Sequence, residues 1–162
     1  MPHSGTDADF GKLIPELQFW NNGRGVSVEA WVGAKGNFEL AVGYSTLFWP
    51  KFIEFDGCIF FSDFSEESYR SFMDQCNGDR QSVEMVVNHR HVFDYFSHTG
   101  GLATLDQILY LGRVMKDILQ AKLARDFPGR TFVVTFSEET AESLDDYEVT
   151  FHQARLDDQP TG

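Results

Sequence analysis

The clearest pattern of apolar positions lies between Thr104 and Asp126 and repeats with the period of an α-helix. With about 100° of rotation per residue, most of its apolar side chains fall in one broad arc. Thr104 and Gln107 have the spacing of a capping box, and Phe127-Pro128-Gly129 ends the pattern. We therefore predict a helix over 104–126 that packs its apolar arc on a sheet or on other helices.

Three further helical segments are predicted upstream. Residues 65–76 carry apolar side chains at helical spacing, and Asn77-Gly78 ends the segment. Asp79 can cap a helix that runs through about Phe96, which should pack as an antiparallel partner of 104–126. Near the N-terminus, 7–20 predicts a short helix that either begins near Pro15 or is divided into two short turns.

Alternating apolar and polar residues predict the strands. The period changes to two from Val26 to Val42, which predicts a β-hairpin with its turn at 34–37. The apolar runs 52–55 and 58–61 are separated by Asp56-Gly57, which is either a hairpin turn or a bulge. Two more strands are predicted near the C-terminus, at 131–136 and 147–152.

Strands and helices are thus segregated along the chain, which favours the α+β class. We expect a largely antiparallel sheet of about five strands, covered on one face by three to four helices. The length of 162 residues suits a single domain, 1–162, with disordered tails at 1–6 and 156–162.

The amino-acid composition indicates what the core contains and where the protein is located. Aromatic residues make up 15% of the chain, so the core should be rich in rings. Cys58 and Cys76 are far apart in sequence and lie in apolar patterns, which favours free thiols over a disulfide or a metal pair. No apolar run is long enough for a bilayer and no signal pattern begins the chain, so we expect a soluble, cytoplasmic protein without membrane contacts.

The net charge of −12 is unevenly distributed. It amounts to −1 over 1–53, −6 over 54–79, +2 over 80–130 and −7 over 131–162. Such a surface repels nucleic acid and would speed encounter with a basic protein partner. The simpler interpretation is that the acidic residues keep the protein soluble.

The segment Asn88-His89-Arg90-His91 is the strongest candidate for chemistry. In an extended segment, His89 and His91 would share a face and could bind one metal ion. In a helix they would point about 160° apart, and the helical pattern of 79–96 therefore disfavours a metal site. No further ligand is evident from spacing, so neither a metal site nor a cofactor is predicted.

The same helical pattern aligns Glu84, Asn88, His91 and His98 on one polar ridge. This ridge either lines a cleft that binds a metal or transfers a proton, or is the solvated face of an amphipathic helix. His89 falls on the apolar side, where a hydrogen-bonded core histidine is the simpler interpretation. Glu84, His89 and His91 are accordingly weak catalytic candidates, and whether the protein is an enzyme stays open.

Aromatic and acidic residues suggest binding instead. Trp31 and Trp49 are candidate protein-binding anchors if one sheet face is uncovered, or they fill a core. No motif resembles a known family, and we expect a non-catalytic inhibitor or immunity-type domain that binds a basic protein. The alternative is a hydrolase or metal-dependent enzyme, and apolar strand edges could form a homodimer. The acidic binding candidates are Glu66, Glu67, Glu138, Glu139, Glu142, Asp145 and Asp146.

Overall fold

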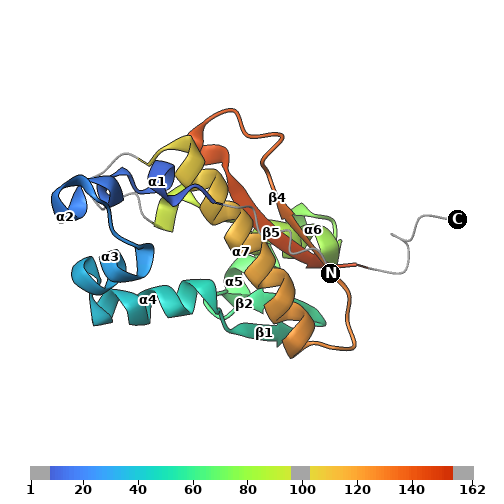
Figure 1. The fold of residues 1–162 in the computed structure, drawn as a ribbon. Helices are drawn as coiled ribbons and strands as arrows, with labels where there is room; N and C mark the ends of the chain where they lie inside the picture. The colour runs from blue at the N-terminus through green and yellow to red at the C-terminus, as the bar shows by residue number, and fades with distance from the viewer. Residues whose placement is uncertain (1–7, 96–102, 155–162) are drawn as a thin grey trace, which may run out of the picture. The chain divides into compact units, whose positions relative to one another are not determined.

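The fold was obtained as a computed structural model, which describes residues 8–95 and 103–154 (Figure 1). The chain divides into two compact units, 1–45 and 46–162, with the boundary inside the last turn of helix α4. Each unit is described by itself. The single domain predicted over 1–162 stays a prediction, and both predicted tails, 1–6 and 156–162, lie outside the described residues.

The first unit is helical. Pro15 divides its beginning into two short turns, one of the two predicted alternatives, because a proline ring is tolerated only in the first turn of a helix. Glu16 then joins the unit's elements: it accepts hydrogen bonds from the indole N–H groups of Trp20 and Trp31 and pairs with Lys35. The elements are α1 (Phe10–Leu13), the 3₁₀ helix η1 (Pro15–Phe19), α2 (Trp20–Gly23), α3 (Val28–Lys35) and most of α4 (Phe38–Phe48).

The hairpin predicted over Val26–Val42 is wrong, because α3 and α4 occupy this segment. Each helix begins at a side-chain cap. The Ser27 hydroxyl accepts a hydrogen bond from the N–H of Ala30, and the Asn37 side chain accepts from Glu39 and Leu40. Such caps satisfy N–H groups that a helix start leaves without partners, and here they outweigh the period of two.

The second unit begins with an antiparallel hairpin of β1 (Phe52–Phe55) and β2 (Cys58–Phe61). Asp56 and Gly57 connect the strands with φ angles of 48° and 75°, as a two-residue hairpin turn requires. The bulge alternative is therefore excluded. Asp56 also accepts hydrogen bonds from Tyr69 and Arg80, which hold the pKa of its carboxyl below the ordinary value and tie the turn to the next two helices.

The remaining elements form a three-stranded sheet and three longer helices. The helices are α5 (Glu66–Gln75), α6 (Arg80–Val87) and α7 (Leu105–Asp126). Two short 3₁₀ helices accompany them: η2 (Phe93–Tyr95) precedes α7, and η3 (Leu144–Asp146) lies between the last two strands. The strands are β3 (Arg90–His91), β4 (Phe132–Phe136) and β5 (Glu148–Gln153), in the order β3-β5-β4 and antiparallel throughout. The α+β class and the antiparallel pairing are confirmed.

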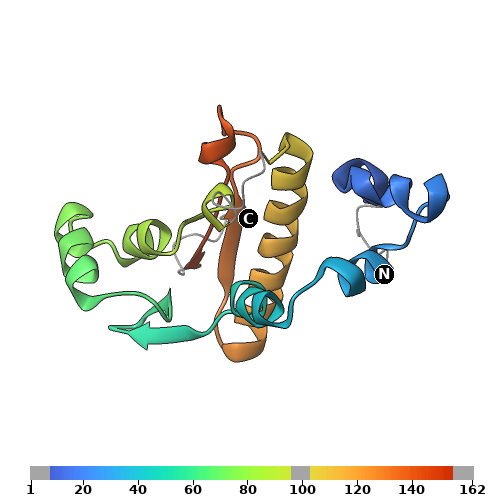
Figure 2. The ribbon, with the colours of Figure 1, turned by 90° about the vertical axis from the view of Figure 1, so that its left-hand side faces the viewer.

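The predicted single sheet is wrong, because the strands form one sheet of two and another of three. Coverage of one face is wrong as well. Val149 and Phe151 of β5 pack in the core with Leu119 and Leu123 of α7. Thr150, which points to the opposite face, donates a hydrogen bond to the carbonyl of Met85 in α6. Figure 2 shows α7 and α6 on opposite sides of the sheet, so they are not the predicted antiparallel pair.

The approach of α7 to the sheet depends on Gly112. A Cβ atom at this position would lie 2.2 Å from the nearest ring atom of Phe136 in β4, which is closer than side chains tolerate. The phenyl ring thus occupies the space that any larger residue would fill. This close packing explains why a helix former is absent from the middle of the longest helix.

Two fully buried polar side chains, Glu84 in α6 and Asn88 at its C-terminal cap, join the two sheets. Glu84 accepts hydrogen bonds from the backbone N–H groups of Ile59 in β2 and Gln153 in β5, each at 2.8 Å. Asn88 accepts from the N–H of Phe61 and donates to the carbonyls of Ile59, at 2.8 Å, and Phe151, at 3.3 Å. We call these contacts the Glu84–Asn88 bridge.

The bridge also ends α6. Asn88 is the C-cap residue, and the chain leaves the helix there to form β3. The prediction of a helix through Phe96 is therefore wrong. The α-helix covers only its first part, Arg80–Val87, and β3 separates this helix from the 3₁₀ turn η2.

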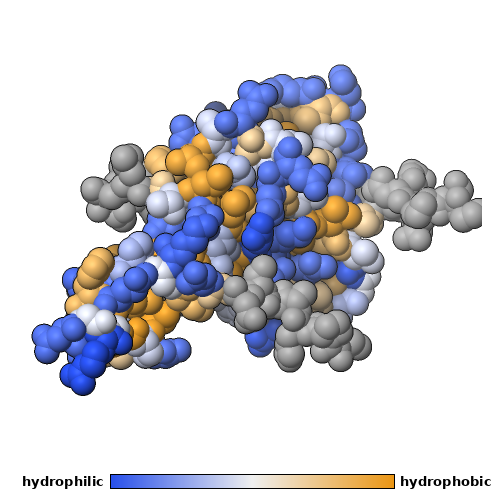
Figure 3. All heavy atoms as spheres, turned by 45° about the horizontal axis from the view of Figure 1, so that its top comes forward, coloured by the Kyte–Doolittle hydropathy of each residue, from blue (hydrophilic) through white to orange (hydrophobic). Residues whose placement is uncertain are grey.

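Apolar side chains also reach the surface. In α3 and α4, Val32, Phe38, Leu40 and Val42 are all at least half exposed. Figure 3 shows apolar residues among polar ones over one face of the molecule. Within residues 8–95 and 103–154, no helix combines the length and apolar character that crossing a membrane requires.

We expect Asn88→Ala to lower the free energy of unfolding by about 2 to 4 kcal/mol, because it leaves buried backbone groups of β2 and β5 without partners. Urea denaturation measures this loss. Gln75→Ala, at an exposed position of α5, is the control and should change stability by less than about 0.5 kcal/mol. Equal stabilities of the two variants would contradict the role of the bridge.

Candidate functional site

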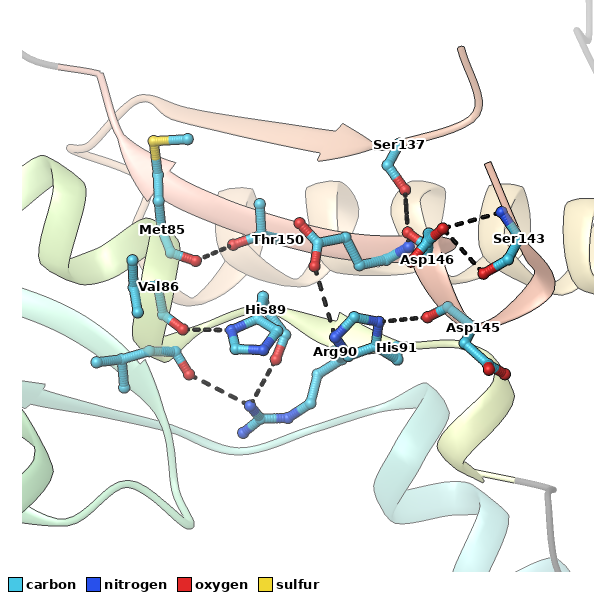
Figure 4. A network of polar contacts seen from close by, with 12 residues as sticks. Met85, Val86, His89, Arg90, His91, Ser137, Ser143, Asp145, Asp146 and Thr150 are labelled. Carbon is cyan, nitrogen blue, oxygen red and sulfur yellow. Dashed lines mark hydrogen bonds and ion pairs between the residues drawn. The ribbon is translucent and has the colours of Figure 1, made fainter. Parts of the chain in front are cut away.

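The two central histidines lie side by side. After Asn88 the chain is extended, and residues two apart in an extended chain point to the same face. The ring centroids of His89 and His91 are 5.2 Å apart, with the planes at 86° (Figure 4). The argument that these rings point apart is thus wrong, because it assumed a helix that ends at Val87.

Glu148 of β5 completes a cluster with them. It is the cross-strand partner of His91, and the two side chains approach to 3.7 Å between Nε2 and a carboxylate oxygen. One ligand atom from each of His89, His91 and Glu148 lies within 4.8 Å of the others. All three residues are half-buried.

Two backbone carbonyls set the orientation of the rings. His89 Nδ1 contacts the carbonyl oxygen of Val86, and His91 Nδ1 lies 2.7 Å from that of Asp145 (Figure 4). A carbonyl oxygen only accepts hydrogen bonds, so each Nδ1 must carry the proton. This leaves the Nε2 lone pair of each histidine for a ligand, which is the arrangement typical of metal-binding histidines.

The geometry fits a metal ion after a small closure. Ligand atoms about 2.1 Å from a tetrahedral ion are about 3.4 Å apart, close to the separation of His91 from Glu148. The limit of 4.8 Å for the whole cluster exceeds this spacing by about 1.4 Å, so binding a metal ion requires the side chains to close by up to that amount.

Comparison with protein families places the chain in one of them. Residues 34–160 match the model of the Uncharacterized protein PM0498 family. The chain belongs to this family. The matched region contains His89, His91 and Glu148, and most of the first unit precedes it. No significant match was found among curated proteins or among solved structures.

The polar ridge predicted on one helix does not form. Glu84 and Asn88 are fully buried in the Glu84–Asn88 bridge, where backbone groups occupy their polar atoms. His91 lies on β3, and His98 is outside the described residues. Of the three catalytic candidates, the structure therefore brings His89 and His91 together. Glu84 is instead part of the buried Glu84–Asn88 bridge.

Sequence reasoning missed Glu148. Its signal was the alternation of Val149 and Phe151 with Glu148 and Thr150, which assigns Glu148 to the polar face of the last strand. Finding the cluster also required the pairing of β5 with β3. The sequence did not reveal β3, because it is only two residues long.

The acidic candidates lie in helix α5 and in the segment between β4 and β5. Glu66 and Glu67 lie in the first turn of α5, and Glu66 pairs with Arg70. In the segment 137–147, hydrogen bonds from Arg113 hold the pKa of Glu138 below its ordinary value. The side-chain and backbone hydrogen bonds of Ser143 do the same for the pKa of Asp146. Exposed acids of this segment include Glu139, Glu142 and Asp145.

The two aromatic candidates lie in different units. Trp31 donates its indole N–H to Glu16 within the first unit. Trp49, in the second unit, is 44% exposed, and the cationic groups of Lys122 and Arg125 lie 5.4 and 5.6 Å from its ring centroid. These cations contribute to holding the Trp49 ring in place.

The carbonyl contacts predict that both His89 and His91 are Nδ1–H tautomers in the metal-free protein under alkaline conditions, where imidazoles are neutral. Free imidazole side chains favour the Nε2–H form, so the two signals should stand out in long-range ¹H–¹⁵N correlation spectra. An Nε2–H tautomer at either position would contradict the orientation described above.

Proposed function

We propose that this protein binds a divalent transition-metal ion through His89, His91 and Glu148 and acts as a metal-dependent enzyme of the hydrolytic type. The observation that carries the proposal is the pair of Nδ1 contacts to backbone carbonyls, which leave both Nε2 lone pairs for a ligand, with Nε2 of His91 3.7 Å from the Glu148 carboxylate. Side chains that merely share a solvated surface have no need of such fixed rings.

The donor set indicates the class of metal. Two imidazoles and one carboxylate suit Zn²⁺ and other first-row transition ions, whereas Ca²⁺ and Mg²⁺ prefer oxygen ligands throughout. A zinc ion held by three protein ligands keeps a position for water or a substrate oxygen, which is typical of catalytic rather than structural sites. The side chains of His91 and Glu148 are 33% and 36% exposed, so a small substrate can approach.

The acidic charge supports cation binding. The chain carries a net charge of −12, of which −7 belongs to 131–162. Asp145, whose carbonyl contacts His91, lies in this acidic block. Clustered negative charge raises the local concentration of cations and speeds their association. Part of the charge that suggested a basic protein partner therefore has a simpler use at the metal site.

A non-catalytic inhibitor or immunity-type function remains the second candidate. It is favoured by the exposure of Glu139, Glu142 and Asp145 and by the 44% exposed ring of Trp49. These residues would attract and anchor a basic protein. Binding of such a partner should weaken strongly between low and high salt, which distinguishes this function from metal binding. Cys58 and Cys76 are not joined in a disulfide, which suits the cytoplasmic location that we propose for either function.

Metal binding can be tested by calorimetric titration of the chelator-treated protein with Zn²⁺. We expect one ion per chain, and a loss of affinity of about 100-fold or more in His91→Ala and in Glu148→Gln, because each removes a ligand. Glu139→Gln, an acid-to-amide change at an exposed position of the neighbouring segment, is the matched control and should bind like the unmodified protein. Absence of Zn²⁺ binding, or equal loss in the control, would refute the proposal.

A further inference from the structure

The turn at 143–146 is closed by its own side chains. The Asp146 carboxylate accepts hydrogen bonds from the backbone N–H and the hydroxyl of Ser143, each at 2.9 Å. This capping box fixes the backbone between the two residues. The carbonyl of Asp145, inside the turn, is thereby held where it accepts the hydrogen bond from His91 Nδ1.

Ser137 connects this turn with a second metal ligand. Its hydroxyl donates to the carbonyl of Asp146 at 2.9 Å and accepts from the backbone N–H of Glu148 at 2.8 Å. One hydroxyl thus lies between the turn that orients His91 and the residue that supplies the carboxylate (Figure 4). A donor and an acceptor contact at once fix the position of both neighbours.

The backbone of Ser137 has a separate task. Its N–H donates to the carbonyl of Glu148 at 3.0 Å and continues the pairing of β4 with β5. Substitution of the side chain leaves this bond in place. Removal of the hydroxyl should therefore displace the turn and Glu148 without separating the strands.

We propose that Ser137 is a positioning residue for the metal site, and that it acts together with the Ser143–Asp146 turn on His91 and Glu148. The inference rests on the proposed function, because it names what orients two of the three proposed ligands. Groups that orient metal ligands typically change metal affinity by about 10- to 100-fold when they are removed.

The test compares Ser137→Ala with Ser137→Thr, which restores the hydroxyl. We expect Zn²⁺ affinity to fall by about 10- to 100-fold in S137A and to recover in S137T. Thr140→Ala is the control: Thr140 is exposed in the same segment, and its hydroxyl donates to the carbonyl of Ser137, which the hydroxyl of Ser137 does not use. It should bind Zn²⁺ like the unmodified protein.

A readout on the metal-free protein separates positioning from general stability. In S137A, His91 should lose its uniform Nδ1–H tautomer in ¹H–¹⁵N spectra while His89, held by Val86, keeps it. A purely structural serine would not change the two histidines differently. If S137A does not fold, Ser143→Ala, which removes one bond of the turn, should show the same selective change at His91.

The outcomes distinguish the two proposals. If the unmodified protein binds no Zn²⁺, the proposed function fails. If the unmodified protein binds Zn²⁺ but S137A binds equally well with an unchanged His91 tautomer, only the positioning role of Ser137 is refuted. A loss in S137A that S137T does not restore would refute it as well.

Discussion

The structure of the second unit depends on two polar side chains buried without contact to water. Glu84 lies in α6 and Asn88 caps its C-terminus one turn later, and both bond to backbone groups of β2 on one side and β5 on the other. Alternate residues of a strand direct their backbone groups to opposite edges, so the edge of β5 beyond the short β3 would be left without partners. The bridge occupies that edge as a further strand would, and it explains why two sheets form instead of one.

The same constraint places the candidate site. Because the Asn88 amide is held between β2 and β5, α6 ends there and the next residues run extended beside β5. His89 and His91 then share a face, and His91 lies opposite Glu148. A bridge needed for stability thus determines the position of groups suited to chemistry. Asn88 thus connects the buried core with the cluster of His89, His91 and Glu148.

Local signals in the sequence were sufficient where they were complete. The capping box at Thr104 and Gln107 fixed the start of α7, and the β-branched run at 132–136 indicated β4. They failed over Val26–Val42, where the alternation of apolar and polar residues indicated strands although Ser27 and Asn37 cap two helices. The end of α6 could not be predicted, because Glu84 and Asn88 at helical spacing resemble a solvated ridge. Only their partners in distant strands distinguish a buried bridge from such a ridge, and the site depended on this distinction.

Anomalous diffraction at the zinc absorption edge, from crystals of the protein grown with Zn²⁺, tests the account most directly. We predict a peak about 2.0 to 2.2 Å from Nε2 of His89, Nε2 of His91 and a carboxylate oxygen of Glu148, with both Nδ1 atoms still bonded to their carbonyls. A zinc ion bound elsewhere, or one held through Nδ1 of either histidine, would contradict it.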